Sequence, residues 1–162
     1  MKLIQENDIV FDTETTGLGT KDQIIQIAII NARGTTLLDT LVSTDRPISP
    51  GARHVHGIGK AELRHAPGWE IIYPVVQEIF NLTRALGGEI WAYNAQFDAR
   101  MLIQTCHAHR LPEPKVIFQC AMWQAVGSMR KLTEVCPVEV NAPAHSAIGD
   151  CLRTLYVLGG EQ

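Results

Sequence analysis

The sequence lacks any apolar run of the roughly 20 residues that a membrane-spanning helix needs. Residues 1–7 also lack the long apolar stretch of a signal peptide. These two absences predict a cytoplasmic protein that makes no membrane contact. Internal repeats and low-complexity segments are not evident either, so we expect residues 1–162 to form a single domain.

Cysteine and basic side chains are both scarce. The four cysteines form no Cys-x-x-Cys pair, which is typical of reduced thiols in an intracellular protein and not of a disulfide framework or a zinc site. The 14 lysines and arginines are outnumbered by 17 acidic residues, which gives a net charge of −3. That balance argues against a protein that coats long nucleic acids through phosphate contacts. It does not exclude an enzyme that holds a few nucleotides, because bound metals can supply positive charge.

Two carboxylates, Asp12 and Glu14, follow the apolar residues 9–11. In an extended strand, residues i and i+2 point to the same face, so both side chains should project from the end of a buried strand. Because they repel each other, both stay ionised only if a cation lies between them, and a divalent metal with oxygen ligands fits that need. Acidic pairs also occur at solvated strand ends, so the pair alone leaves both interpretations open.

The segment that follows the pair is suited to contact a ligand. Gly17 permits a tight turn or a close approach of the backbone to a bound group. Thr15 and Thr16 offer hydroxyl and amide donors beside it.

The periodicity of apolar residues predicts an α/β fold. Runs of β-branched residues bounded by turn residues predict strands over 8–14, 24–30, 35–42, 90–93 and 116–118. Helical periodicity predicts helices over 69–86, 95–109, 121–129 and 147–158. Short connections make the first three strands an antiparallel meander, whereas the strand–helix–strand order after residue 90 makes the last two parallel.

Residues 45–51 and 54–59 are expected to be loops. His54 and His56 stand two residues apart and could ligate a metal, but no further histidine or cysteine lies close enough to complete a zinc set. The residues themselves therefore favour a surface loop, and contact with a ligand remains the alternative.

Polar residues stand at the starts of two predicted helices. Asn94 is suited to an N-cap, and Asp98 falls in the first helical turn, where the helix dipole alone accounts for a carboxylate. Ser146 can cap the last helix, with Asp150 one turn further on. His145 comes just before that cap, where a lone histidine is ordinarily a surface residue.

Four blocks, in order, carry a family resemblance. They are Phe11-Asp12-Thr13-Glu14-Thr15-Thr16-Gly17-Leu18, His56-Gly57-Ile58, Asn94-Ala95-Gln96-Phe97-Asp98, and His145-Ser146-Ala147-Ile148-Gly149-Asp150 with Thr154 one turn on. Together they resemble the DnaQ-like 3′–5′ exonucleases that carry four acids and a catalytic histidine (DEDDh). The family includes polymerase proofreading subunits and small stand-alone DNA and RNA exonucleases. The resemblance spans nearly the whole chain and implies a ribonuclease-H-like fold, a mixed five-stranded sheet with helices on both sides.

The resemblance also implies the chemistry. Asp12, Glu14, Asp98 and Asp150 match the family's metal-binding acids, which hold two divalent ions, Mg²⁺ or Mn²⁺. His145 matches the general base, and Glu14 would help hold the metal that carries the attacking water, so both count as catalytic. The implied reaction is removal of nucleoside 5′-monophosphates from the 3′ end of a single strand of DNA, with RNA as the alternative.

The resemblance implies a set of substrate contacts as well. The implied contacts are Thr15, Thr16, Gly17, Leu18, His56, Ile58, Asn94 and Phe97. The first four would receive the terminal nucleotide and its 3′-hydroxyl, and His56 and Ile58 would line the pocket for its base. Phe97 is equally suited to the core.

Departures and alternatives stay open at this point. Gln119 stands where many relatives carry an acid, which puts the local support of the site in doubt. The chain ends soon after its last helix, so we expect a stand-alone nuclease more than a tethered polymerase subunit, and a homodimer is compatible with the family. The alternative functions are an oligoribonuclease-like scavenger of short RNA and a catalytically silent module that binds nucleic-acid ends. A silent module would have no need of a general base.

Overall fold

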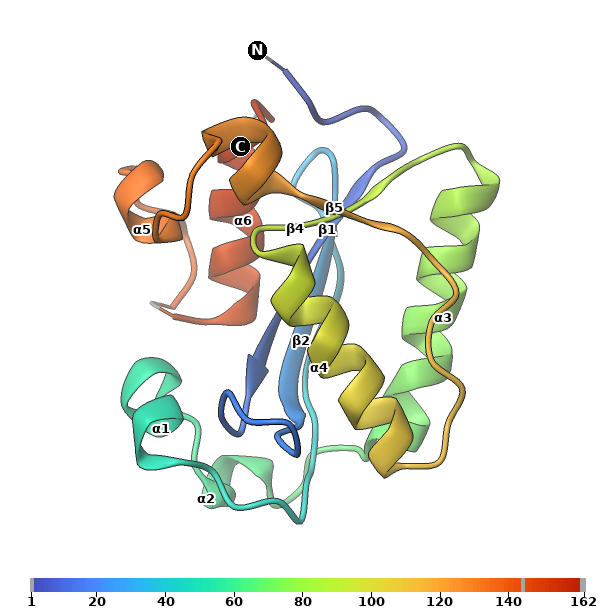
Figure 1. The fold of residues 1–162 in the computed structure, drawn as a ribbon, viewed down its shortest axis with the longest axis vertical. Helices are drawn as coiled ribbons and strands as arrows, with labels where there is room; N and C mark the ends of the chain where they lie inside the picture. The colour runs from blue at the N-terminus through green and yellow to red at the C-terminus, as the bar shows by residue number, and fades with distance from the viewer. Residues whose placement is uncertain (1, 144, 161–162) are drawn as a thin grey trace.

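A mixed five-stranded sheet in the order β3-β2-β1-β4-β5 runs through the middle of the structure (Figure 1). This computed structural model describes residues 2–143 and 145–160. The strands are β1 (Ile9–Thr15), β2 (Ile24–Asn31), β3 (Thr36–Leu41), β4 (Ile90–Ala92) and β5 (Phe118–Cys120). β2 pairs antiparallel with β1 and β3, and β4 pairs parallel with β1 and β5. The predicted meander and the predicted parallel pair are therefore confirmed.

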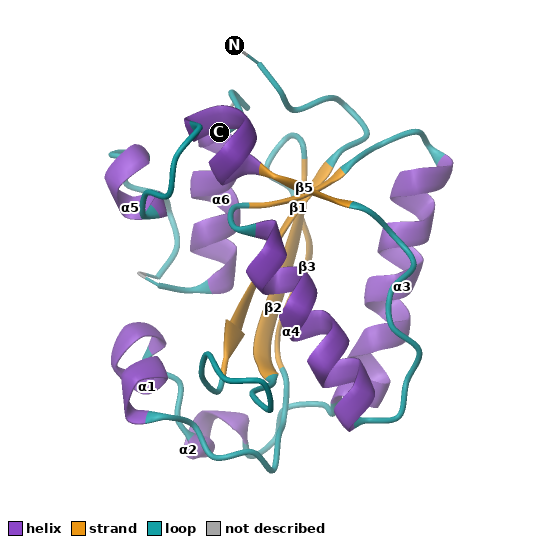
Figure 2. Cartoon of the chain, viewed as in Figure 1, coloured by secondary structure: helices purple, strands orange, loops and turns teal. Residues whose placement is uncertain are grey.

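Helices cover both faces of this sheet, as predicted (Figure 2). The long helices are α3 (Trp69–Ala85), α4 (Ala95–Ala108) and α6 (Ala147–Val157). Phe11 on β1 packs with Phe80 in the core shared with α3 and α4, whereas its neighbour Val10 packs with Leu155 in the core under α6. Because successive residues of a strand point to opposite faces, β1 contributes to both cores and is buried on both sides.

Residues 50–51 and 54–56, expected to lie in two loops, belong to one helix, α1 (Pro50–His56). The Ser49 hydroxyl accepts a hydrogen bond from the Ala52 amide at 3.1 Å, and Gly57 ends the helix with a φ of 72°. The loop prediction is wrong because proline is a breaker inside a helix yet is well tolerated in its first turn, where the missing amide costs nothing.

The second half of the chain also differs in detail from the prediction. The fifth strand begins at Phe118 and not at residue 116, and the predicted helix over 121–129 is a short π-helical turn, η1 (Met122–Val126). Helices α2 (Lys60–Leu63) and α5 (Leu132–Val135) were not predicted. Four residues make one turn, which is too short to show helical periodicity. Within the described residues, no helix has the length and apolar character needed to cross a bilayer.

Asp8 joins the starts of β1 and β4. One carboxylate oxygen accepts hydrogen bonds from the Gln5 amide at 2.8 Å and from the Trp91 indole at 3.1 Å, and the other accepts from the Glu89 amide at 2.8 Å. A buried carboxylate with three donors is well satisfied. These contacts fix the parallel register, in which Val10 lies opposite Trp91.

Gly88, just before β4, lies next to Asn7, just before β1. The two backbones are so close that a Cβ atom on Gly88 would collide with the Asn7 carbonyl. We therefore expect Gly88→Ala to lower the free energy of unfolding by about 1–3 kcal/mol, the usual cost of overpacking. Urea denaturation measures this. Gly51→Ala is the control, since its Cβ would meet nothing within 4 Å. A Gly88→Ala protein as stable as the wild type would contradict the close approach.

Candidate active site

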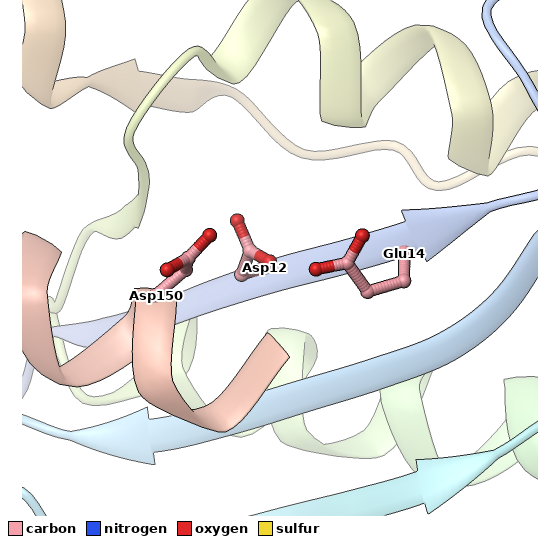
Figure 3. Close-up of side chains that lie close together, drawn as sticks. All are labelled: Asp12, Glu14 and Asp150. Carbon is pink, nitrogen blue, oxygen red and sulfur yellow. The ribbon is translucent and has the colours of Figure 1, made fainter. Parts of the chain in front are cut away.

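Three carboxylates from two distant segments meet along β1 (Figure 3). Asp12 and Glu14 project from the same face of β1, and Asp150 projects from the first turn of α6. One oxygen from each carboxylate lies within 4.8 Å of the others. Clustered carboxylate oxygens are the ligands that Mg²⁺ and Mn²⁺ prefer, so these residues fit a divalent metal.

Hydrogen bonds fix the start of α6 over the strand. The Ser146 hydroxyl accepts from the Gly149 amide at 3.2 Å, which confirms the predicted cap. The amide of Ala147 donates to the side-chain oxygen of Gln26, on β2, at 3.0 Å. Because the helix is held to β2 at its first residue, Asp150 is carried to the face of β1 that bears the other two acids.

The fourth predicted acid, Asp98, lies close to this trio but outside it. It is buried in the first turn of α4, where it accepts a hydrogen bond from the Thr13 hydroxyl at 2.7 Å. Its charge raises the pKa of both Asp12 and Glu14. Sequence reasoning missed Thr13 as a supporting residue, although strand alternation turns it away from Asp12 and toward α4.

Burial raises the pKa of all four acids, and the charges of neighbouring acids raise it further for Asp12, Glu14 and Asp98. Burial raises the pKa of Asp12 well above its usual range, and the charges of the other three acids raise it further. Burial, followed by the charges of Asp150 and Asp98, raises the pKa of Glu14 to about 8. Burial raises the pKa of Asp98 to about 7, against the opposing hydrogen bond from Thr13. A neighbouring cation is therefore needed to keep all four ionised near neutral pH.

Arg153 forms an ion pair with Asp150. Its Nη1 donates to the carboxylate at 3.0 Å, and its side chain is 14% exposed. Burial raises the pKa of Asp150, whereas Arg153 and, more weakly, His145 lower it. Sequence reasoning missed Arg153, and the signal available was its place three residues beyond Asp150 on one helix face.

His145 is exposed beside the acids. Its backbone is left-handed, with a φ of 52°, a conformation in which histidine is enriched relative to most other residues that carry a Cβ. With Asp150 it lines a cavity of about 430 Å³, which Asn94, Arg130 and Lys131 also line. The structure thus brings His145 to the same end of the sheet as the acids, and its role as a general base stays a prediction.

A separate cavity of about 250 Å³ opens beside Glu14. It is lined by Thr13, Glu14, Thr15, Gly17, Leu18, Ser49, Gly51, Ala52, Val55, His56 and Phe97. Five of the predicted substrate contacts are in this set, and Asn94 lines the other cavity. Thr16 is buried and hydrogen-bonded to Asp22, and Ile58 packs against Ile25 and Leu63. Neither of these two lines the cavity.

His56 connects α1 to the end of β1. Its Nδ1 accepts a hydrogen bond from the Ile58 amide at 3.0 Å, so its Nε2 carries the proton and donates to the Thr15 carbonyl at 3.0 Å. Burial lowers the pKa of His56, although the Thr15 carbonyl opposes this. A neutral His56 therefore holds the wall of the smaller cavity in place.

Gln119, where the family resemblance implied an acid, has two side-chain partners outside the acidic cluster. Its amide donates to Glu89 at 3.1 Å and its carbonyl accepts from Gln124 at 2.6 Å. Glu89 precedes β4, whereas Asn94 and the acids lie beyond the other end of that strand. Gln119 therefore supports the entry to β4.

Sequence comparison gives two informative relatives and a family. The profile of the RNase T exonuclease family matches residues 9–158. The chain is 30% identical to "Uncharacterized exonuclease CP81" of Escherichia phage 186, across 97% of this chain and 89% of that protein. It is 35% identical to "Exodeoxyribonuclease 10" of Escherichia coli K12, across 92% of this chain and 66% of that protein.

Solved structures share the fold. "Exonuclease X in complex with 5′ overhanging duplex DNA" has a TM-score of 0.65 at 27% identity and covers 92% of this chain and 88% of its own. The nuclease domain of 3′hExo, "a DEDDh family member, bound to rAMP", has a TM-score of 0.70 at 15% identity with the same two coverages, and shows the fold alone. These likenesses confirm the predicted ribonuclease-H-like fold.

Metal-free protein should lose stability as the pH rises. The folded-state pKa values of Asp98 and Glu14 are raised to about 7 and about 8. The stability that these groups contribute is therefore fully present below their unfolded-state values near 4 and is lost as the pH rises through 8. In EDTA, Asp12→Asn should raise the melting temperature at pH 8 by several degrees and change it little at pH 5.

Exposed Asp45 supplies the control, because Asp45→Asn removes the same charge outside the cluster. Added Mn²⁺ should stabilise the wild-type protein at pH 8 and stabilise Asp12→Asn much less. A melting temperature of Asp12→Asn equal to that of the wild type at pH 8 in EDTA would contradict the repulsion.

Proposed function

This chain belongs to the RNase T exonuclease family, and we propose that its acidic site removes nucleotides one at a time from the 3′ end of a DNA strand. The observation that carries this proposal is the convergence of Asp12, Glu14 and Asp150 within 4.8 Å, with Asp98 close by. The metal-dependent 3′–5′ exonuclease reaction is that of the family. The substrate, the metal and the residue roles are our proposal.

We assign the four acids to two divalent ions. Asp12, Glu14 and Asp150 would hold one ion between them, and Asp98 would join Asp12 in holding a second. Bound Mg²⁺ or Mn²⁺ supplies the positive charge that stabilises the attacking and leaving oxygens of a phosphoryl displacement. Thr13 and Arg153 keep the carboxylates of Asp98 and Asp150 oriented for this task.

His145 is the residue that we assign to proton transfer. It is exposed at the rim of the larger cavity, beside Asp150, so it can reach a water molecule held there. Histidine is the side chain used most often as a general base, and removal of a proton from the water makes that water a better nucleophile. The products are a nucleoside 5′-monophosphate and a strand shortened by one residue.

The two cavities on either side of the acids suit the two sides of the scissile bond. The cavity of about 250 Å³ beside Glu14 has apolar walls from Leu18, Val55 and Phe97, which fit a base. The cavity of about 430 Å³ carries Arg130 and Lys131, whose positive charges fit the phosphates of the remaining strand. The relative named as an exodeoxyribonuclease and the neighbour bound to DNA support DNA over RNA.

The direct test is a time course with 5′-labelled single-stranded DNA and RNA of equal sequence, each with Mg²⁺, Mn²⁺ or EDTA. We expect a ladder that shortens by one nucleotide at a time, faster for DNA, and stopped by EDTA. If RNA, above all very short RNA, is shortened faster than DNA, the substrate is RNA and the proposal of DNA is wrong. Binding of ends without shortening under any metal would overturn the enzyme assignment.

Asp150→Ala should abolish turnover, because it removes a ligand from the carboxylate cluster. The variant should stay folded, since the loss of one charge relieves repulsion, and circular dichroism checks this. Isothermal titration with Mn²⁺ should show weaker binding. Wild-type activity in Asp150→Ala would contradict the proposed metal site.

His145→Ala should lower kcat by about 10²- to 10⁴-fold, the usual contribution of a general base. Mn²⁺ affinity should change much less than in Asp150→Ala, because His145 is assigned to the proton and not to the metal. Single-turnover rates of His145→Ala and the wild type, compared between pH 6 and 9, measure the fall in rate, and isothermal titration measures the Mn²⁺ affinity. An unchanged rate would remove His145 from the role.

A further inference from the structure

The connection between β1 and β2 is long for neighbouring antiparallel strands and is held from two sides. Residues 16–23, here called the 16–23 loop, contribute Gly17 and Leu18 to the smaller cavity. Leu18 is 77% exposed. An unsupported loop of this length would be mobile, so the contacts that hold it decide whether the cavity exists before a nucleotide arrives.

Asp22 holds the loop from within. One of its carboxylate oxygens accepts a hydrogen bond from the Thr16 hydroxyl and the other accepts one from the Gly19 amide, both at 2.7 Å. A Cβ atom on Gly17 would come within 2.7 Å of this carboxylate, and one on Gly19 within 2.9 Å. The two glycines that flank Leu18 therefore let the backbone wrap around Asp22.

Arg100 and Gln104, one turn apart on α4, hold the same loop from outside. Arg100 donates to the Leu18 carbonyl at 3.1 Å, and its guanidinium lies 5.5 Å from the centre of the Phe97 ring. The Gln104 amide donates to the Gly19 carbonyl at 3.1 Å and to the Asp22 carbonyl at 2.9 Å. Arg100 thus links two walls of the cavity, the loop and Phe97.

We infer that Asp22 and Arg100 are positioning residues for the 3′-terminal nucleotide. They hold Gly17 and Leu18 against the cavity in advance, so binding a nucleotide does not have to order the loop. Neither side chain lines the cavity or the acidic cluster, so both act through the loop. This inference rests on the proposed function, because it assigns the smaller cavity to the terminal nucleotide.

The test separates binding from chemistry. For Asp22→Ala and Arg100→Met, we expect KM for single-stranded DNA to rise about tenfold while kcat stays within about threefold of the wild type, because ordering the loop becomes part of binding. The dissociation constant of dAMP in Mn²⁺, measured by isothermal titration, should rise by a similar factor. Asp22→Asn, which keeps the acceptor for Thr16 but loses the one for Gly19, should fall between Asp22→Ala and the wild type.

Two control variants remove the same charges elsewhere on the surface. Asp45 and Arg64 are exposed, and among the described contacts neither forms a hydrogen bond with the 16–23 loop. Asp45→Ala and Arg64→Met should therefore leave KM unchanged. The double variant of Asp22 and Arg100 should raise KM by less than the product of the single effects, because both residues restrain one loop.

The outcomes keep the two proposals apart. Unchanged dAMP affinity in a folded Arg100→Met protein would overturn the positioning role, whatever the wild-type activity. A fall in kcat without a rise in KM would also overturn it. A wild-type protein without exonuclease activity would overturn the proposed function, while the dAMP titration would still test the loop.

Discussion

Repulsion among carboxylates is the constraint on which this structure depends. Asp12, Glu14 and Asp150 converge within 4.8 Å, and the charge of Asp98 reaches the first two. Such a cluster is unfavourable in a protein interior until a cation neutralises it, so the surrounding fold must hold it together meanwhile. The site is therefore a place where the protein gives up stability in exchange for affinity toward metal ions.

Burial of β1 on both faces offsets the unfavourable free energy of the clustered carboxylates. Phe11 packs toward α3 and α4 and Val10 toward α6, and neither is exposed to solvent. The strand that carries the repelling acids is thus the central one of five, with hydrogen-bonded neighbours on each side. The packing of residues 9–11 therefore holds in place the end of β1 that carries Asp12 and Glu14.

Local rules predicted much of the fold and the acidic core of the site. Strand alternation gave the shared face of Asp12 and Glu14, and the cap at Ser146 gave the helix that carries Asp150. These features depend on residues close together in sequence, so a single chain is enough to read them. The closeness of Asp98 and Asp150 to the pair on β1 came from the family resemblance, and the structure shows it directly.

What the sequence did not show depends on contacts between distant segments. Thr13 and Arg153 looked like ordinary strand and helix residues, and their role appears once Asp98 and Asp150 are in place. Helix α1 was not predicted because its N-cap, Ser49, is followed by a proline and a glycine, which are typical of a loop. Ile58, expected near the base, is drawn into a small cluster with Ile25 and Leu63, because apolar burial there outweighs exposure at a cavity.

The bond between Thr13 and Asp98 joins residues 85 positions apart, and the contact of the Cys151 thiol with the Val10 carbonyl spans 141. Closing such long loops costs chain entropy, which the packing of the segments that they join has to offset. The last acid arrives with the same helix that covers the second face of the sheet. During synthesis, then, the acidic site is incomplete until α6 has been made and packed on the sheet, because this one helix supplies both Asp150 and the cover of the second core.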